Sequence, residues 1–75
     1  FNPATTIRFS LPAPGNAELE IFTVTGQKAA TLVQGHLDAG THTVTWDADG
    51  FSAGVYICRL RSGEHTATQK MVLIR

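Results

Sequence analysis

The sequence has a single cysteine, no long apolar run and no excess of charge of either sign. Cys58 cannot form a disulfide bond within the chain, so packing alone must hold the domain together. The longest apolar run, residues 71–74, is far shorter than the roughly 20 residues that a membrane-spanning helix needs. Six basic residues balance six acidic ones, which leaves no basic surface for nucleic acid or an anionic membrane.

The start of the chain also lacks the features of a complete exported protein. It begins at Phe1, and no basic stretch followed by an apolar run occurs near that residue. We therefore expect a fragment of a larger protein whose leader lies upstream. A chain of 75 residues suffices for one domain, residues 1–75, but it buries only about 60% of its unfolded surface. Nearly all of its apolar residues are needed for one core.

Apolar and polar residues alternate with a period of two over most of the chain, which is typical of strands with one buried face. The expected strands cover residues 5–11, 17–24, 41–47, 55–61 and 66–74. Residues 27–33 suit a helical turn or a short strand equally well, and we favour the strand. The expected inward-facing side chains include Ile7, Phe9, Leu11, Ala17, Leu19, Ile21, Val44, Trp46, Tyr56, Cys58 and Leu60.

Turn signals separate these strands. They are the Pro12 to Asn16 segment, Thr25-Gly26, a loop made by Gly35 with residues 37–40, Asp47 to Gly50, and a hairpin turn at residues 62–64. Short strands at this spacing, without a convincing helix, predict an all-β fold in which two antiparallel sheets form a sandwich.

The order of several short motifs resembles a known family. The motifs are Phe1-Asn2-Pro3, Leu37-Asp38-Ala39-Gly40, Val44-Thr45-Trp46-Asp47, Gly54-Val55-Tyr56 and the terminal segment from Lys70. Together they resemble the C-terminal sorting domain, type A, of the type IX secretion system, and are similar to the related immunoglobulin-like domain of flagellar hook-capping proteins. The resemblance covers nearly the whole chain. It implies an immunoglobulin-like sandwich of about seven short strands at the C-terminus of an exported protein.

The resemblance also implies a function and its partners. In such families an N-terminal cargo domain of the same chain reaches the periplasm, where the outer-membrane translocon recognises the folded sorting domain. A sortase-like surface peptidase then often removes the domain and joins the cargo to an anionic lipopolysaccharide. The expected location is therefore the cell surface or the medium, reached through the periplasm. The domain would be a substrate of that machinery rather than an enzyme, and no cofactor is expected.

The segments most similar to the family's motifs supply the residues expected to meet the translocon, with the last strand as the main recognition element. These residues are Gly54, Val55, Tyr56, Lys70, Met71, Val72, Leu73, Ile74 and Arg75. The chain departs from the family pattern in two ways. A further Pro-Asn-Pro before Phe1 is missing, together with the upstream processing site, and Cys58 stands where the family more often has an aromatic or polar residue.

Two catalytic or metal-binding interpretations are weaker than structural ones. Gly50-Phe51-Ser52-Ala53-Gly54 has the spacing of a hydrolase nucleophile elbow, but that motif requires a parallel strand turning into a helix. The predicted flanks are antiparallel strands, so we expect a glycine-defined loop. The residues that could bind zinc or calcium are His36, His42, His65, Asp38, Asp47 and Asp49. Their spacing fits no standard site, and turn chemistry accounts for the aspartates.

Other functions stay open on the sequence alone. A carbohydrate-binding or adhesion module of a secreted hydrolase would need an exposed line of aromatics, for which Phe22, Phe51 and Tyr56 are the candidates. A structural domain of a hook-cap type scaffold is the third alternative. The apolar run at residues 72–74 is either a buried closing strand or an exposed edge that accepts a strand from a partner. Such an edge would also allow weak homodimerisation.

Overall fold

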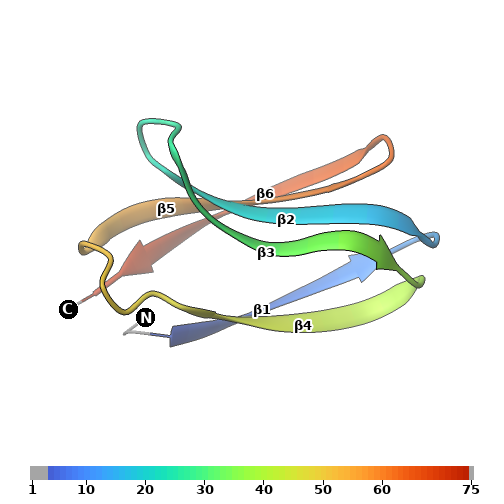
Figure 1. Ribbon diagram of the computed structural model, residues 1–75, viewed down its shortest axis with the longest axis horizontal. Helices are drawn as coiled ribbons and strands as arrows, with labels where there is room; N and C mark the ends of the chain where they lie inside the picture. Colours follow the sequence, from blue (N-terminus) through green and yellow to red (C-terminus); the bar gives the residue numbers. More distant parts are fainter. Residues whose placement is uncertain (1–3, 75) are drawn as a thin grey trace.

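The computed structural model describes residues 4–74, which form six β-strands in two antiparallel sheets (Figure 1). The strands are β1 (Ala4–Leu11), β2 (Gly15–Thr23), β3 (Lys28–Leu37), β4 (Gly40–Asp47), β5 (Gly54–Ser62) and β6 (His65–Leu73). One sheet contains β1 and β4, and the other has the order β3-β2-β5-β6. The predicted all-β sandwich is confirmed. The described residues contain six strands, however, rather than about seven.

The core lies between the two sheets and follows the predicted alternation. Its buried members are Ile7, Leu11, Ala17, Leu19, Ile21, Trp46, Ala48, Tyr56, Cys58, Leu60 and Leu73. Ala17, Leu19 and Ile21 occupy alternate positions of β2, so all three point to the same side of the sheet. Phe9 and Val44, also predicted inside, are half-buried and pack against the core from the narrow β1–β4 sheet.

An aromatic cluster joins the two sheets near one end of the sandwich. The ring centroid of Trp46 lies 5.3 Å from that of Tyr56 and 5.5 Å from that of Phe51. The Tyr56 hydroxyl donates a hydrogen bond of 2.6 Å to the carbonyl oxygen of Ser52. Trp46 comes from the small sheet and Tyr56 from the large one, so this cluster ties the loop between β4 and β5 to both sheets.

Cys58 lies in the core, as the alternation with Tyr56 and Leu60 predicts. The cysteine is free and buried, and that burial raises the pKa of its thiol above the usual value. A thiol that is buried in apolar surroundings stays protonated near neutral pH and reacts slowly. Cys58 therefore acts as a small apolar side chain in this core.

The expected boundaries of the second and third strands were wrong. β3 runs on to Leu37, because Gly35 pairs with Ala17 and Leu37 pairs with Gly15 of β2. Glycine at position 35 allows this, since its φ is +146°. The expected loop at residues 35–40 is therefore reduced to the two residues between β3 and β4. At the other end, β2 stops at Thr23, and Val24 lies in the turn instead of the strand.

Gly15 and Asn16, which were expected in the turn after the first strand, belong to β2. The turns after β4 and β5 lie close to their predicted positions. The Asp47 carboxylate accepts a hydrogen bond of 3.0 Å from the backbone N–H of Asp49, which is the self-capped turn typical of aspartate. β5 and β6 are joined by a two-residue loop in which Gly63 has a φ of +59°. Positive φ at the first loop position is what a type II′ hairpin turn requires. This hairpin places β6 beside β5 along its whole length.

The backbone at Gly54, where β5 begins, is the basis of a prediction. Its φ is +148°, a conformation that residues with a side chain rarely adopt, although nothing lies within 4 Å of an added Cβ. We expect Gly54→Ala to lower the free energy of unfolding by about 1–3 kcal/mol through backbone strain alone. Gly15 also has open space for a Cβ and has no positive φ. Gly15→Ala is therefore the matched control, and equal destabilisation in urea titrations would contradict this interpretation.

Candidate functional site

The terminal strand β6 is an edge strand of the large sheet. It pairs with β5 in an unbroken antiparallel register from Gly54↔Leu73 to Ser62↔His65. No strand among residues 4–74 pairs with its other side. In Figure 1, β6 ends at the same end of the sandwich at which β1 begins. The strand expected to meet the translocon is thus the last strand of the sheet order and is held by β5 along its whole length.

The candidate residues on β6, and Ile74 directly after it, divide between two faces. Leu73 is 1% exposed and belongs to the core, and Met71 packs against the core from the same face. Val72 and Ile74 point outward and are 47% and 57% exposed. Lys70 is also exposed on this outward face. Arg75 lies outside the described residues. Leu73 is buried, as the interpretation of a closing strand requires, whereas Val72 and Ile74 face outward. Acceptance of a partner strand at this edge stays a prediction.

The candidates on β5 have different surroundings. Tyr56 is buried and bonded to Ser52, and Gly54 provides the special backbone angle at the start of the strand. Val55 points outward, is half-buried, and pairs directly with Val72 of β6. Val55, Val72 and Ile74 therefore form one outward-facing set, which we name the outer apolar patch. It brings together one residue of the Gly-Val-Tyr motif and two residues of the terminal motif.

An ionic cluster lies further along the same outer face, and it was not predicted. Glu20 is only 2% exposed although it points away from the core. Its carboxylate lies 2.8 Å from Lys28 Nζ, 3.2 Å from Arg59 Nη2 and 3.8 Å from Arg61 Nη2. Arg61 also forms an ion pair of 3.1 Å with Glu18. The cluster connects β3, β2 and β5 across the outside of the sheet.

Neighbouring side chains explain the burial of Glu20. Hydrogen bonds from Lys28 and then Arg59 lower the pKa of this carboxyl from its ordinary value, more than burial raises it. The Arg59 guanidinium also lies 4.5 Å from the centre of the Phe22 ring, a cation–π contact. The alternation along β2 puts Glu18, Glu20 and Phe22 on one face. Only the register between the strands brings three basic side chains to the same carboxylate.

The hydrolase-like spacing at residues 50–54 forms a loop, as expected. Ser52 is exposed between β4 and β5, and a strand rather than a helix follows it. Its carbonyl oxygen is the acceptor for Tyr56. No group of three or more metal-ligating side chains occurs within residues 4–74. His42 instead makes a contact of 2.7 Å between its Nε2 and the Asp38 carbonyl oxygen.

The aromatic side chains do not form a line on one exposed face. Phe22 lies on the outer face of the large sheet beneath Arg59, whereas Tyr56 is buried on the inner face. Phe51 is half-buried in the aromatic cluster with Trp46 and Tyr56. Sugar-binding platforms need an accessible ring face. The three aromatics proposed for a carbohydrate site therefore do not assemble one.

Comparison with known families identifies one match. The model of a family described as the secretion system C-terminal sorting domain matches residues 2–74, nearly the whole chain. Comparisons with curated proteins and with solved structures give no significant match. Among the described residues, no helix has the length and apolar character needed to cross a membrane.

Removing the charge of Glu20 should destabilise the domain more than removing that of Glu18. We expect Glu20→Gln to lower the free energy of unfolding by about 1–3 kcal/mol, since it leaves two cations without their buried partner. Glu18 is 39% exposed in its side chain, and Glu18→Gln should cost less than about 1 kcal/mol. Urea unfolding of both variants measures the difference, and equal losses would refute a special role for Glu20.

The lowered pKa of Glu20 also predicts a pH dependence. A carboxyl whose pKa is lower in the folded state contributes its full stabilisation above the unfolded value, near 4.5. That contribution is lost as the pH falls through the folded value. The stability difference between the unmodified chain and Glu20→Gln should therefore be largest near neutral pH and shrink below about pH 4.5. A difference that is constant from pH 7 to pH 3 in urea titrations would contradict this.

Proposed function

The chain belongs to the family of secretion system C-terminal sorting domains, and we propose that its outward-facing β6 residues are what the translocon reads. The domain is a C-terminal sorting signal for type IX secretion, which directs an attached cargo through the outer membrane to the cell surface or the medium. This function implies an interaction with the secretion machinery and with an N-terminal cargo region. The proposal concerns where on the domain that interaction takes place.

The observation that carries the proposal is the exposure of apolar side chains on the outer face of β6. Val72 and Ile74 are two of the three large apolar residues exposed within residues 4–74, and Lys70 lies beside them on the same face. Contiguous apolar surface on a small soluble domain commonly marks a binding site. The outer apolar patch presents this surface on two paired strands, so a partner can contact side chains of β5 and of β6 together.

The buried candidates support recognition indirectly. Leu73 and Tyr56 fix β6 and β5 to the core, and Gly54 sets the start of β5. Substituting them would alter the shape of the outer apolar patch by disturbing the fold. We assign direct contact with the translocon to Lys70, Val72 and Ile74, with Val55 at the border of the patch.

The route of the cargo follows from this assignment. A surface built from two paired strands exists only after folding, so the translocon would read the folded domain in the periplasm. The domain would act as a substrate there and carry out no catalysis itself. Removal by a sortase-like surface peptidase, with attachment of the cargo to the cell surface, would be the later step.

A secretion assay tests the recognition surface directly. Residues 1–75 are joined to the C-terminus of a periplasmically targeted fluorescent reporter in a host with a working type IX system and in one without its translocon. Surface or medium fluorescence is expected only in the first host. The double variant Val72→Glu/Ile74→Glu should reduce the exported fraction about tenfold or more, because charges replace the apolar contact.

The matched control is Thr66→Glu/Thr68→Glu, which places the same charges at exposed positions on the same face of β6. Its export should stay close to that of the unmodified chain. Urea unfolding of both double variants must show that the fold is retained. Equal export of the two double variants would overturn the outer apolar patch as the recognition surface. Periplasmic retention of the unmodified fusion in both hosts would mean that residues 1–75 are insufficient for export of the reporter.

A further inference from the structure

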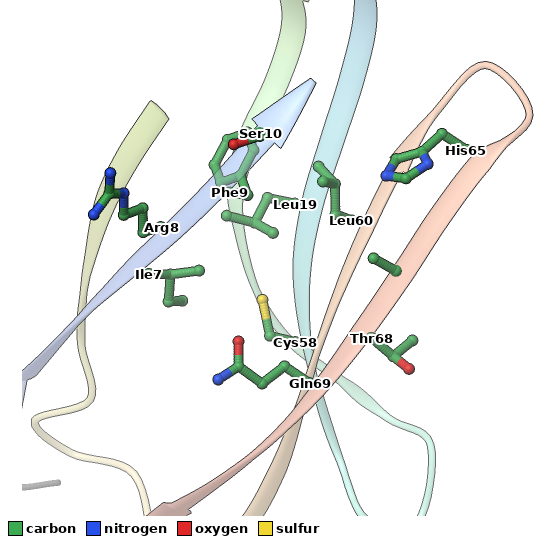
Figure 2. Close-up of a pocket in the computed structure, with 11 residues that line it drawn as sticks. Ile7, Arg8, Phe9, Ser10, Leu19, Cys58, Leu60, His65, Thr68 and Gln69 are labelled. Carbon is green, nitrogen blue, oxygen red and sulfur yellow. The ribbon is translucent and has the colours of Figure 1, made fainter. Parts of the chain in front are cut away.

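A groove opens between the two sheets on the side opposite the outer apolar patch. Its volume is about 220 Å³. The lining comes from β1, β6 and the floor strands β2 and β5, with Ile7, Phe9, Leu19, Cys58, Leu60 and Ala67 as its apolar members. Figure 2 shows Ile7 and Cys58 within the gap between β1 and β6, and Gln69 extending from β6 toward it.

The groove exists because the two sheets have unequal widths. The small sheet has two strands and the large sheet has four, so the small sheet cannot cover the inner face of the whole large one. On β5, Cys58 and Leu60 are buried. Their pairing partners on β6 are Gln69 and Ala67, which face the same side of the sheet but are exposed. The inner face of β6 is thus left uncovered at this point.

The groove is bordered by a strand edge that has no strand partner. β1 pairs with β4 on one side only, and the side that faces the groove is unpaired by any strand among the described residues. In an antiparallel pair, alternate residues of an edge strand direct their N–H and C=O groups away from their partner. An extended segment beside β1 would receive backbone hydrogen bonds and place every second side chain over the apolar floor.

The size and charge of the groove restrict what can occupy it. Sites for small organic molecules usually measure about 300–1,000 Å³, so this groove suits a few side chains of an extended chain better than a separate ligand. Its polar lining includes Arg8 and His65 and contains no carboxylate. A segment with acidic side chains would complement Arg8 at the rim, and a basic one would be disfavoured.

We propose that the groove accepts an acidic, extended segment of a partner protein, which adds to the free edge of β1 as a third strand of the small sheet. Its inward side chains cover Cys58, Leu60 and Ala67, and its acidic side chains face Arg8. The added strand makes the small sheet wide enough to cover the exposed inner face of β6. This surface is separate from the outer apolar patch and does not depend on the recognition role proposed for that patch.

Titration with a designed peptide tests the inference. The probe is a peptide of about nine residues in which valine alternates with glutamate and threonine, blocked at both ends. On addition to the isotopically labelled chain, the amide signals of residues 7–10 should shift and their hydrogen exchange should slow, with a Kd below about 1 mM. A peptide with central prolines, which cannot donate backbone hydrogen bonds, and one with lysine in place of glutamate should both bind at least about tenfold more weakly.

Two variants of the chain distinguish peptide binding in the groove from binding elsewhere on β6. Ala67→Glu places a negative charge inside the groove and should weaken binding about tenfold or more. Thr66→Glu, on the adjacent exposed residue but on the outer face, should leave the Kd unchanged. Absence of shifts at residues 7–10, or equal effects of the two variants, would overturn the proposal. Sedimentation of the chain alone provides a further test. A dimer that Ala67→Glu dissociates and Thr66→Glu does not would also overturn the proposal, because the groove would then bind a second copy of the chain.

Discussion

The structure depends on the contact between the inner faces of β2 and β5 and the narrow sheet above them. Leu19 and Ile21 of β2 and Cys58 of β5 are buried there, and Trp46 reaches across from β4 to meet Tyr56. No disulfide reinforces this contact, because the chain has a single cysteine. Each strand of the domain is therefore held by packing and by the backbone pairing that the packing permits.

Because the small sheet packs against only one face of the large sheet, the two faces of the large sheet have different roles. The inner face supplies the core, and the outer face carries the outer apolar patch at one end and the ionic cluster around Glu20 further along. The cluster connects β2, β3 and β5 on the face of the sheet that points away from the core. Leu73 fastens β6 from inside. A sorting signal of this size can thus keep its terminal strand in place and still present Val72 and Ile74 to a partner.

The short motifs that carry the family resemblance have unequal structural roles. Gly54 and Tyr56 serve the backbone turn and the aromatic cluster, although both occur in a motif that was expected to meet the translocon. Val55 lies on the outer surface between them. A motif can therefore characterise a recognition domain while most of its residues maintain the fold. The residues that remain accessible are those that alternate with the core positions.

The sequence by itself determined which segments form strands, which of their faces are buried and where most turns lie, because the period of two and the turn residues are local properties of the chain. It placed Trp46 and Cys58 in the core correctly, and it indicated the family through the order of its motifs. It did not predict the full length of β3, since that depends on pairing with β2. Only the tertiary structure decided that Glu20 is buried among three cations, that β6 lies at an edge, and that a groove opens beside β1. Those features arise from register and from the unequal widths of the sheets, which join residues far apart in the chain.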